Sequence, residues 1–282
     1  MNIAFFGASI TQQKSGYVYH FKELNTNYNV QQFGYGGMYI TDAGICFIDE
    51  VISQKPDYCF LDWFSPACYR PPEKIKEYLD AIVEKLFNIN CQPIFLLFHR
   101  KQMDPGWFVM FDYLKAYASN YDINYIDLSK LEEPDRYLRD TIHTNDLGSK
   151  KYGEIIYKQF YSMNFKNKIN TPRKNKWSKI YCLDSKLIAQ KHIVLKSFGC
   201  SSIVGVLQNV GPYTGSIKYL NQNQSYAIQL KDQWSERYER LTIKLGINDF
   251  RGELAIEIPN NEKLVWEKLF YIGDEVKIVD YS

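Results

Sequence analysis

A hydroxyl, an imidazole and a carboxylate in two short stretches of the 282-residue chain could together perform nucleophilic catalysis. Ser9 lies just beyond an apolar run at residues 3–6, and Asp140 precedes His143 by three positions. At that spacing a carboxylate can accept a hydrogen bond from imidazole Nδ1–H, which fixes the tautomer and leaves Nε2 free as a base. A serine beside such a base is activated as a nucleophile. Each motif alone is weak evidence, because a serine after a strand is often only a helix N-cap.

A glycine-rich segment with the sequence G-Y-G-G begins at Gly34, after a second apolar run at residues 28–33. Glycine lets the backbone approach a ligand closely and adopt positive φ. One backbone amide of this segment could point at a developing oxyanion; a tight turn is the alternative interpretation. The segment is not a dinucleotide-binding fingerprint, because no glycine occupies the sixth position of the pattern.

The elements that must position these groups can be read from apolar periodicity over the first ~165 residues. Short apolar runs typical of strands buried on both faces cover residues 3–6, 28–33, 58–63, 93–98 and 124–128. Amphipathic stretches with helical spacing cover residues 18–24, 72–88, 107–119 and 146–161. This alternation predicts an α/β domain, a parallel sheet with helices on both faces. Ligands of such open sheets bind at the carboxyl ends of the strands, where Ser9 would lie.

The second part of the chain has a different pattern. Short runs, several of them alternating apolar and polar residues, are separated by turn residues and cover residues 203–207, 216–220, 226–230, 241–245, 254–258, 269–272 and 276–279. Many short strands at near-regular spacing predict an all-β sandwich. We therefore expect an α/β domain at residues 1–165, a polar linker at 166–176 and a β-sandwich at 177–282, which could serve carbohydrate binding or oligomerisation. Four aromatic residues could form a sugar-stacking face or pack in the core or between the domains: Trp177, Tyr213, Trp234 and Trp266.

The motifs, taken together and in this order, resemble those of the SGNH (GDSL-like) hydrolase family over residues 1–162. The sequence G-A-S-I-T around Ser9 is similar to the first block of that family, with Ala8 in place of its Asp. Gly37 is similar to the oxyanion glycine of the second block, and D-T-I-H-T-N-D-L-G, with Asp140 and His143, is similar to the last block. The resemblance implies a flavodoxin-like α/β fold and a serine esterase.

The same resemblance implies a role for each matching residue. Ser9 is the implied nucleophile, His143 the general base, and Asp140 the group that orients His143. The backbone amides of Ser9 and Gly37 are the implied oxyanion donors. The implied substrate is an ester of a carbohydrate or a small molecule, and no metal or organic cofactor is needed.

One block of the family pattern is missing, and this leaves the reaction open. The third block should supply an Asn donor to the oxyanion, but the segment after residue 57 reads Y-C-F-L-D-W-F-S-P, without Asn. Ser65 is the nearest donor by position, and losing an oxyanion donor costs on the order of 3 kcal/mol. Three functions remain: an esterase that removes an acyl group such as O-acetyl, a sugar O-acyltransferase with the same triad, or a non-catalytic glycan- or partner-binding protein with a degenerate oxyanion hole.

Composition narrows the partners and the location. A net charge of +2 builds no strong field, so nucleic acid is not an expected partner. The sequence contains no run of 18 apolar residues, so no membrane-spanning helix is predicted. The first residues do not resemble a secretory signal, so we expect a cytoplasmic protein. Six cysteines without CxxC spacing predict reduced thiols, neither a disulfide framework nor a zinc site. The β domain could also mediate homo-oligomerisation.

Four other polar residues have less definite roles. His99 follows the apolar run at residues 93–98 and could line the pocket or face solvent. Asp62 ends a strand and could face the pocket or bind backbone. We expect His20 at the surface of a helix, and His192 has no nearby set of metal ligands.

Overall fold

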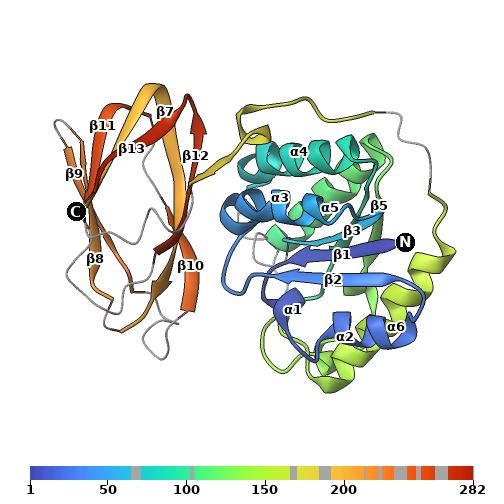
Figure 1. The fold of residues 1–282 in the computed structure, drawn as a ribbon. Helices are drawn as coiled ribbons and strands as arrows, with labels where there is room; N and C mark the ends of the chain where they lie inside the picture. The colour runs from blue at the N-terminus through green and yellow to red at the C-terminus, as the bar shows by residue number, and fades with distance from the viewer. Residues whose placement is uncertain are drawn as a thin grey trace. The chain divides into compact units, whose positions relative to one another are not determined.

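The computed structural model divides the chain into two compact units, Met1–Ser178 and Lys179–Ser282 (Figure 1). It describes residues 1–64, 71–101, 105–165, 170–183, 192–212, 214–221, 224–231, 240–245, 249–257 and 266–281. The two units are described separately below.

The first unit is built on a five-stranded parallel sheet in the order β2-β1-β3-β4-β5. The strands are β1 (Asn2–Gly7), β2 (Asn29–Gly34), β3 (Tyr58–Asp62), β4 (Gln92–Leu97) and β5 (Asn124–Asp127). The helices are α1 (Ser9–Gln12), α2 (Tyr17–Leu24), α3 (Ile45–Ser53), α4 (Glu73–Asn88), α5 (Pro105–Asn120) and α6 (Asp146–Ser162). Helices α2 and α6 cover one face of the sheet, and α3 and α4 lie on the other (Figure 1). The predicted flavodoxin-like α/β fold is confirmed.

Apolar side chains on both faces of the strands explain why this sheet forms. All residues of β1 except Asn2 are buried, so the strand has no solvent face. Phe5 stacks on Phe60 at 4.5 Å and meets Phe21 of α2 edge-on at 5.0 Å, which ties two strands to a helix. Burial of such aromatic rings dominates the energetics of a core. The position of β1 in the sheet, and with it the end of β1 at Gly7, is therefore firmly set.

One feature of this unit, helix α3, differs from the sequence prediction. Helix α3 was not predicted from the sequence; its buried residues are Ile45, Cys46, Phe47, Ile48 and Val51, and its exposed side carries Asp49 and Ser53. A short π-helical turn, Ile40–Gly44, leads into it. The polar stretch expected as a linker is described from residue 170 onward, and part of it packs on α4. Asn175 Nδ2 donates to the Glu77 carbonyl at 2.8 Å, and Trp177 packs on Tyr78 with ring centroids 4.4 Å apart.

The second unit is antiparallel and all-β, as predicted. Its strands are β6 (Tyr181–Leu183), β7 (His192–Val210), β8 (Ser216–Asn221), β9 (Gln224–Gln229), β10 (Arg240–Leu245), β11 (Phe250–Glu257), β12 (Trp266–Gly273) and β13 (Val276–Tyr281). The long strand β7 pairs with β11 and β13 along its first half and with β10 and β12 along its second. A buried cluster that includes Leu195, Val206 and Leu254 forms the core.

Strand β7 shows where apolar periodicity failed in this unit. The predicted run at residues 203–207 is only a part of the 19-residue strand. Its middle contains Gly199, where a Cβ would lie 2.0 Å from Asp274 Oδ2, and Cys200, whose amide donates to that carboxylate at 2.7 Å. The contact with Asp274 interrupts the alternation of buried and exposed side chains in the middle of β7, so the strand is not visible as one run in the sequence.

Among the aromatic residues considered for sugar stacking, Trp177 is used in packing. Its ring lies on Tyr78, and its Nε1 donates to Glu77 Oε2 at 3.1 Å. The side chains of Tyr213, Trp234 and Trp266 lie outside the described part of the structure.

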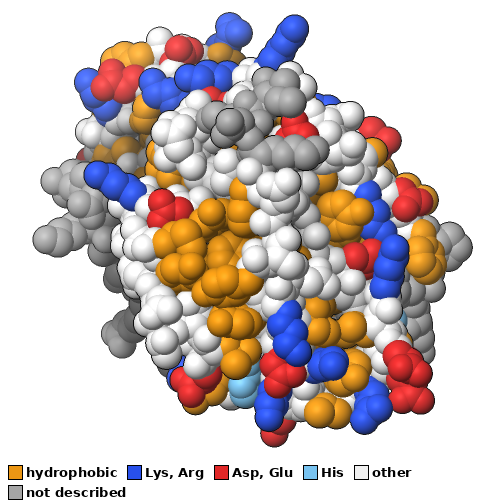
Figure 2. Space-filling view, turned by 90° about the vertical axis from the view of Figure 1, so that its right-hand side faces the viewer, with side chains coloured by type: hydrophobic (Ala, Val, Ile, Leu, Met, Phe, Trp, Pro, Cys, Tyr) orange, Lys and Arg blue, Asp and Glu red, His pale blue; other side chains and the backbone are white. Residues whose placement is uncertain are grey.

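The described surface and helices bear on the kinds of partner the protein could bind. Figure 2 shows Lys and Arg side chains interspersed with Asp and Glu around a group of hydrophobic side chains, so that face carries no field of a single sign. Among the described helices, none combines the length and the hydropathy needed to span a membrane.

Three of the cysteines, Cys46, Cys59 and Cys91, are buried free thiols. Burial raises the pKa of the Cys59 and Cys91 thiols, which keeps them protonated and unreactive.

Candidate active site

Ser9 is held at the carboxyl edge of the sheet by a close approach between the ends of β1 and β3. Gly7, the last residue of β1, has no room for a side chain, because a Cβ would lie 2.6 Å from Asp62 Cβ and 2.7 Å from the Asp62 carbonyl oxygen. The amide of Ala8 donates to that carbonyl at 2.9 Å. The chain then turns into α1 with Ser9 as its first residue. Glycine is therefore required where this turn crosses the neighbouring strand.

His143 lies on a loop that folds back on itself before α6. A bridge joins Leu138 to Thr144, and the amide of Arg139 donates to the His143 carbonyl at 2.9 Å. Asn145 then caps α6, because its side chain accepts from the amide of Gly148 at 2.8 Å. Such a cap fixes where a helix starts and so fixes the residues just before it.

The structure brings Ser9, His143 and Asp140 together in the predicted order. Ser9 Oγ lies 2.8 Å from His143 Nε2, although 134 residues separate them in the sequence. His143 Nδ1 lies 2.9 Å from Asp140 Oδ2 and 3.1 Å from Oδ1. These distances are normal for hydrogen bonds and fit a histidine that is protonated on Nδ1 and accepts the serine hydroxyl proton at Nε2.

The carboxyl group of Asp140 is arranged to stay ionised. Burial raises its pKa, but hydrogen bonds from the backbone amides of His143 at 2.8 Å and Ile142 at 2.9 Å, together with the His143 ring, outweigh this and lower the pKa below its usual value of 3.8. An ionised carboxylate is what can orient a histidine and stabilise it when it becomes charged.

Because the folded state lowers the pKa of Asp140, this carboxylate stabilises the fold above its unfolded pKa and stops doing so as pH falls through the folded pKa. Asp140→Asn keeps an oxygen that can accept from the amides of Ile142 and His143, but it removes the negative charge. Its destabilisation should be below about 1 kcal/mol near pH 7, since water screens a half-exposed carboxylate, and should shrink at about pH 3. Urea unfolding of both proteins at the two pH values measures this, and a difference that does not change with pH would contradict it.

The glycine-rich segment packs against the turn that carries Ser9. A Cβ on Gly34 would lie 2.4 Å from the backbone N and Cα of Gln12, so only glycine allows this approach. Gly37 is exposed and has φ of 71°, a left-handed conformation that favours glycine. Both observations fit the predicted turn, and the oxyanion role of Gly37 and of the Ser9 amide stays a prediction. Ser65, the predicted substitute for the missing Asn, lies outside the described residues.

A buried polar network beneath Ser9 was not recognised in the sequence. Asp62 is fully buried and accepts a hydrogen bond from Thr11 Oγ1 at 2.9 Å. Thr11 Oγ1 also lies 2.7 Å from the hydroxyl of Tyr17, and burial, followed by the charge of Asp62, raises the pKa of that tyrosine. The sequence signal for this network is a carboxylate at the end of a buried strand, Asp62.

His99 is a buried residue rather than a solvent-facing one. Its Nε2 lies 2.6 Å from Asp135 Oδ1, and its side chain is only 9% exposed. Next to it, the amide of Lys101 donates to the Thr141 carbonyl at 2.9 Å. The segment after β4 thus supports the loop that carries Asp140 and His143. His20 is partly exposed on α2, as expected.

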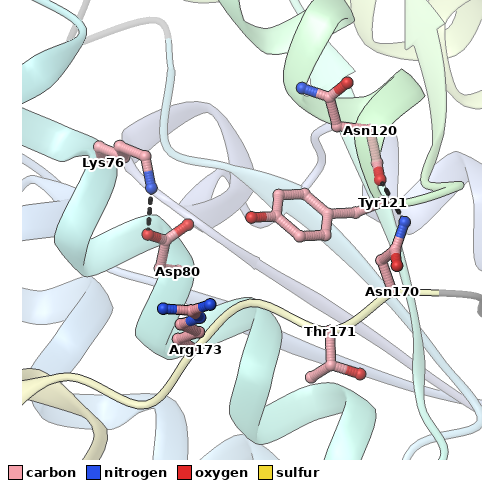
Figure 3. Close-up of a pocket in the computed structure, with 7 residues that line it drawn as sticks. All are labelled: Lys76, Asp80, Asn120, Tyr121, Asn170, Thr171 and Arg173. Carbon is pink, nitrogen blue, oxygen red and sulfur yellow. Dashed lines mark hydrogen bonds and ion pairs between the residues drawn. The ribbon is translucent and has the colours of Figure 1, made fainter.

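A separate open pocket of about 560 Å³ lies over α4 and the end of α5 (Figure 3). It is lined by Lys76, Asp80, Asn120, Tyr121, Asn170, Thr171 and Arg173, none of which belongs to the Ser9 site. Lys76 pairs with Asp80, whose other oxygen accepts from Tyr117 at 2.9 Å. The charged carboxylate of this pocket is therefore already compensated by the protein. Across the described ranges, no three His, Cys, Asp or Glu side chains gather closely enough to hold a metal ion.

Comparison with known proteins gives matches at the level of structure. No family model and no curated protein matches the sequence. A two-domain esterase (CEX) active on acetylated mannans matches with a TM-score of 0.72 at 12% identity, over 98% of this chain and 92% of its own. An acetyl xylan esterase, AlAXEase, matches with a TM-score of 0.51 at 20% identity, over 56% of this chain and 99% of its own. The N-terminal unit has the SGNH (GDSL-like) hydrolase fold.

Further agreement comes from a member of the lipolytic G-D-S-L family from Veillonella parvula DSM 2008. It matches with a TM-score of 0.50 at 22% identity, over 58% of this chain and all of its own. The SGNH fold predicted from the residues around Ser9, Gly37 and His143 is thereby confirmed for the first unit. The match to the two-domain esterase covers nearly the whole chain and so includes the all-β unit as well.

Proposed function

We propose that the protein is a serine esterase of the SGNH type that removes O-acetyl groups from a carbohydrate. The observation that carries this proposal is the 2.8 Å contact between Ser9 Oγ and His143 Nε2, with Asp140 on the other ring nitrogen. The choice of substrate is supported by two proteins of the same fold, one active on acetylated mannans and one an acetyl xylan esterase.

In the proposed reaction, Ser9 Oγ attacks the ester carbonyl while His143 Nε2 takes the hydroxyl proton. Asp140 stabilises the imidazolium that forms. The amides of Ser9 and Gly37, with Ser65 in place of the missing Asn, hold the tetrahedral oxyanion. His143 returns the proton to the leaving alkoxide, and water then releases acetate from Ser9 by the same steps in reverse order.

Hydrolysis is proposed rather than transfer to a sugar hydroxyl because the two proteins of the same fold named above are esterases. The side chain of His143 is 22% exposed, so water can reach the base that must activate it. The expected cytoplasmic location, and a homo-oligomer formed through the all-β unit, stay predictions.

The test is acetate release from acetylated mannan and acetylated xylan, with p-nitrophenyl acetate as a simple ester. We expect the wild-type protein to release acetate from at least one polysaccharide and to hydrolyse the simple ester. Hydrolysis of the simple ester alone would remove the carbohydrate from the proposal. If the wild-type protein turns over none of the three substrates faster than Ser9→Ala does, the result favours a non-catalytic glycan- or partner-binding protein instead.

A further inference from the structure

We propose that Gln13 is a positioning residue for the reaction, whose side-chain amide holds the Ser9 turn against the His143 loop. This inference rests on the proposed function. Gln13 follows α1 directly, four residues after Ser9, and Thr144 is the residue next to His143. The two residues that Gln13 joins are thus neighbours of the two that must exchange a proton.

Both ends of the Gln13 amide bind the same partner. Gln13 Nε2 donates to the Thr144 carbonyl oxygen at 3.2 Å, and Thr144 Oγ1 donates to Gln13 Oε1 at 3.0 Å. A pair of hydrogen bonds to one residue fixes orientation as well as distance. This Gln13–Thr144 clamp therefore limits both the separation and the rotation of the two segments.

The clamp is anchored on both sides. Thr144 is 2% exposed, and its hydroxyl lies 2.7 Å from Ser149 Oγ in the first turns of α6. Since that hydroxyl donates to Gln13, it accepts from Ser149. On the other side, Gln32 Nε2 of β2 donates to the backbone carbonyls of Gln13 and Thr11. Helix α6 and strand β2 are thereby connected through the clamp.

The order of the sheet shows what the clamp adds. Ser9 follows β1, and the His143 loop follows β5 at the edge of the sheet, with β3 and β4 in between, so no direct strand pairing joins the two segments. Packing of α2 on α6 brings them near each other, and the clamp adds hydrogen bonds next to the reacting groups. A proton transfer needs heavy atoms within hydrogen-bond reach, and a misplacement of about 1 Å can cost about 100-fold in rate.

The experiment compares kcat and KM for p-nitrophenyl acetate in four variants. Gln13→Ala removes both hydrogen bonds of the clamp, and Thr144→Val removes the one that the Thr144 hydroxyl donates. Each should lower kcat about tenfold to hundredfold while KM stays within about twofold. Thr144→Ser keeps the hydroxyl and should keep most of kcat. The combination of Gln13→Ala and Thr144→Val should lose little more than Gln13→Ala alone, because Gln13→Ala already removes the bond that Thr144→Val removes.

Gln31→Ala is the matched control, because it removes an exposed glutamine bond of 3.0 Å to Gln54, away from the site. It should leave kcat and KM unchanged. Thermal unfolding of each variant shows whether it is folded. If Gln13→Ala does not fold, the test is the comparison of kcat between Thr144→Val, where it should fall, and Thr144→Ser, where most of it should remain.

Three results would overturn the inference. If Gln13→Ala and Thr144→Val keep kcat within about twofold while Ser9→Ala is inactive, the clamp does not position the reacting groups. If KM rises and kcat does not fall, these residues act in substrate binding instead. If the wild-type protein shows no activity above Ser9→Ala, the proposed function and the inference fail together.

Discussion

Ser9→Ala should lower kcat/KM for acetyl esters by on the order of 10⁴-fold or more. The substitution removes Ser9 Oγ, the atom that lies 2.8 Å from His143 Nε2 and would attack the ester. Without this nucleophile no acyl-enzyme can form. Residual turnover would come from binding and the oxyanion donors alone. Because Ser9 is partly exposed and makes no described side-chain bond other than that to His143, the variant should keep its fold.

The measurement is the rate of p-nitrophenyl acetate hydrolysis, repeated with an acetylated polysaccharide. Ser53→Ala is a matched control, since Ser53 is exposed at the end of α3 and its hydroxyl bonds the Glu50 carbonyl and the Gln54 side chain, away from the site. It should be as active as the wild type. Equal rates for Ser9→Ala and Ser53→Ala would contradict the assignment of Ser9 as nucleophile.

His143→Ala should lose about as much activity as Ser9→Ala, and the double variant about as much as either alone, because residues that act as one unit have non-additive effects. Asp140→Asn should cost somewhat less, on the order of 10³- to 10⁴-fold, since the nucleophile and the base both remain while the carboxylate that orients the base is lost. The expected order of activity is thus wild type, Asp140→Asn, and then the two lowest variants together.

His20→Ala provides the control for this series, because His20 lies on α2 and contacts Tyr19 edge-on at 5.2 Å, outside the site. It should leave kcat/KM unchanged. The rates are measured near pH 7, where the lowered pKa of Asp140 keeps its carboxylate ionised. A His143→Ala variant much more active than Ser9→Ala would mean that another base serves the serine.

The fold could be predicted well where apolar runs are bounded by turns. The five parallel strands and helices α2, α4, α5 and α6 lie close to their predicted ranges, because each has a clear strand or helix period. Helix α3 was missed although it has a buried and an exposed side, because it is only nine residues long and closely follows the glycine-rich segment. Only the second part of the long strand β7 was predicted, since the strand is interrupted by the contact of Gly199 and Cys200 with Asp274.

The site could be predicted from residues in recognisable sequence patterns and not from those that act through tertiary contacts. Ser9, Asp140 and His143 stand in motifs whose order resembles a known family. Asp62 and Gln13 do not: their partners lie 51 and 131 positions away, and only the folded chain brings Thr11 and Thr144 to them. A sequence alone does not show which polar residues will meet across a sheet edge.

The central claim is that Ser9 is a nucleophile activated by His143. Its most direct test is covalent labelling with a fluorophosphonate, followed by mass spectrometry of the digested protein, which depends on no choice of substrate. We expect one adduct per chain, located on Ser9, absent from Ser9→Ala and slow to form in His143→Ala. An unlabelled wild-type protein, or an adduct that persists in Ser9→Ala, would contradict the claim.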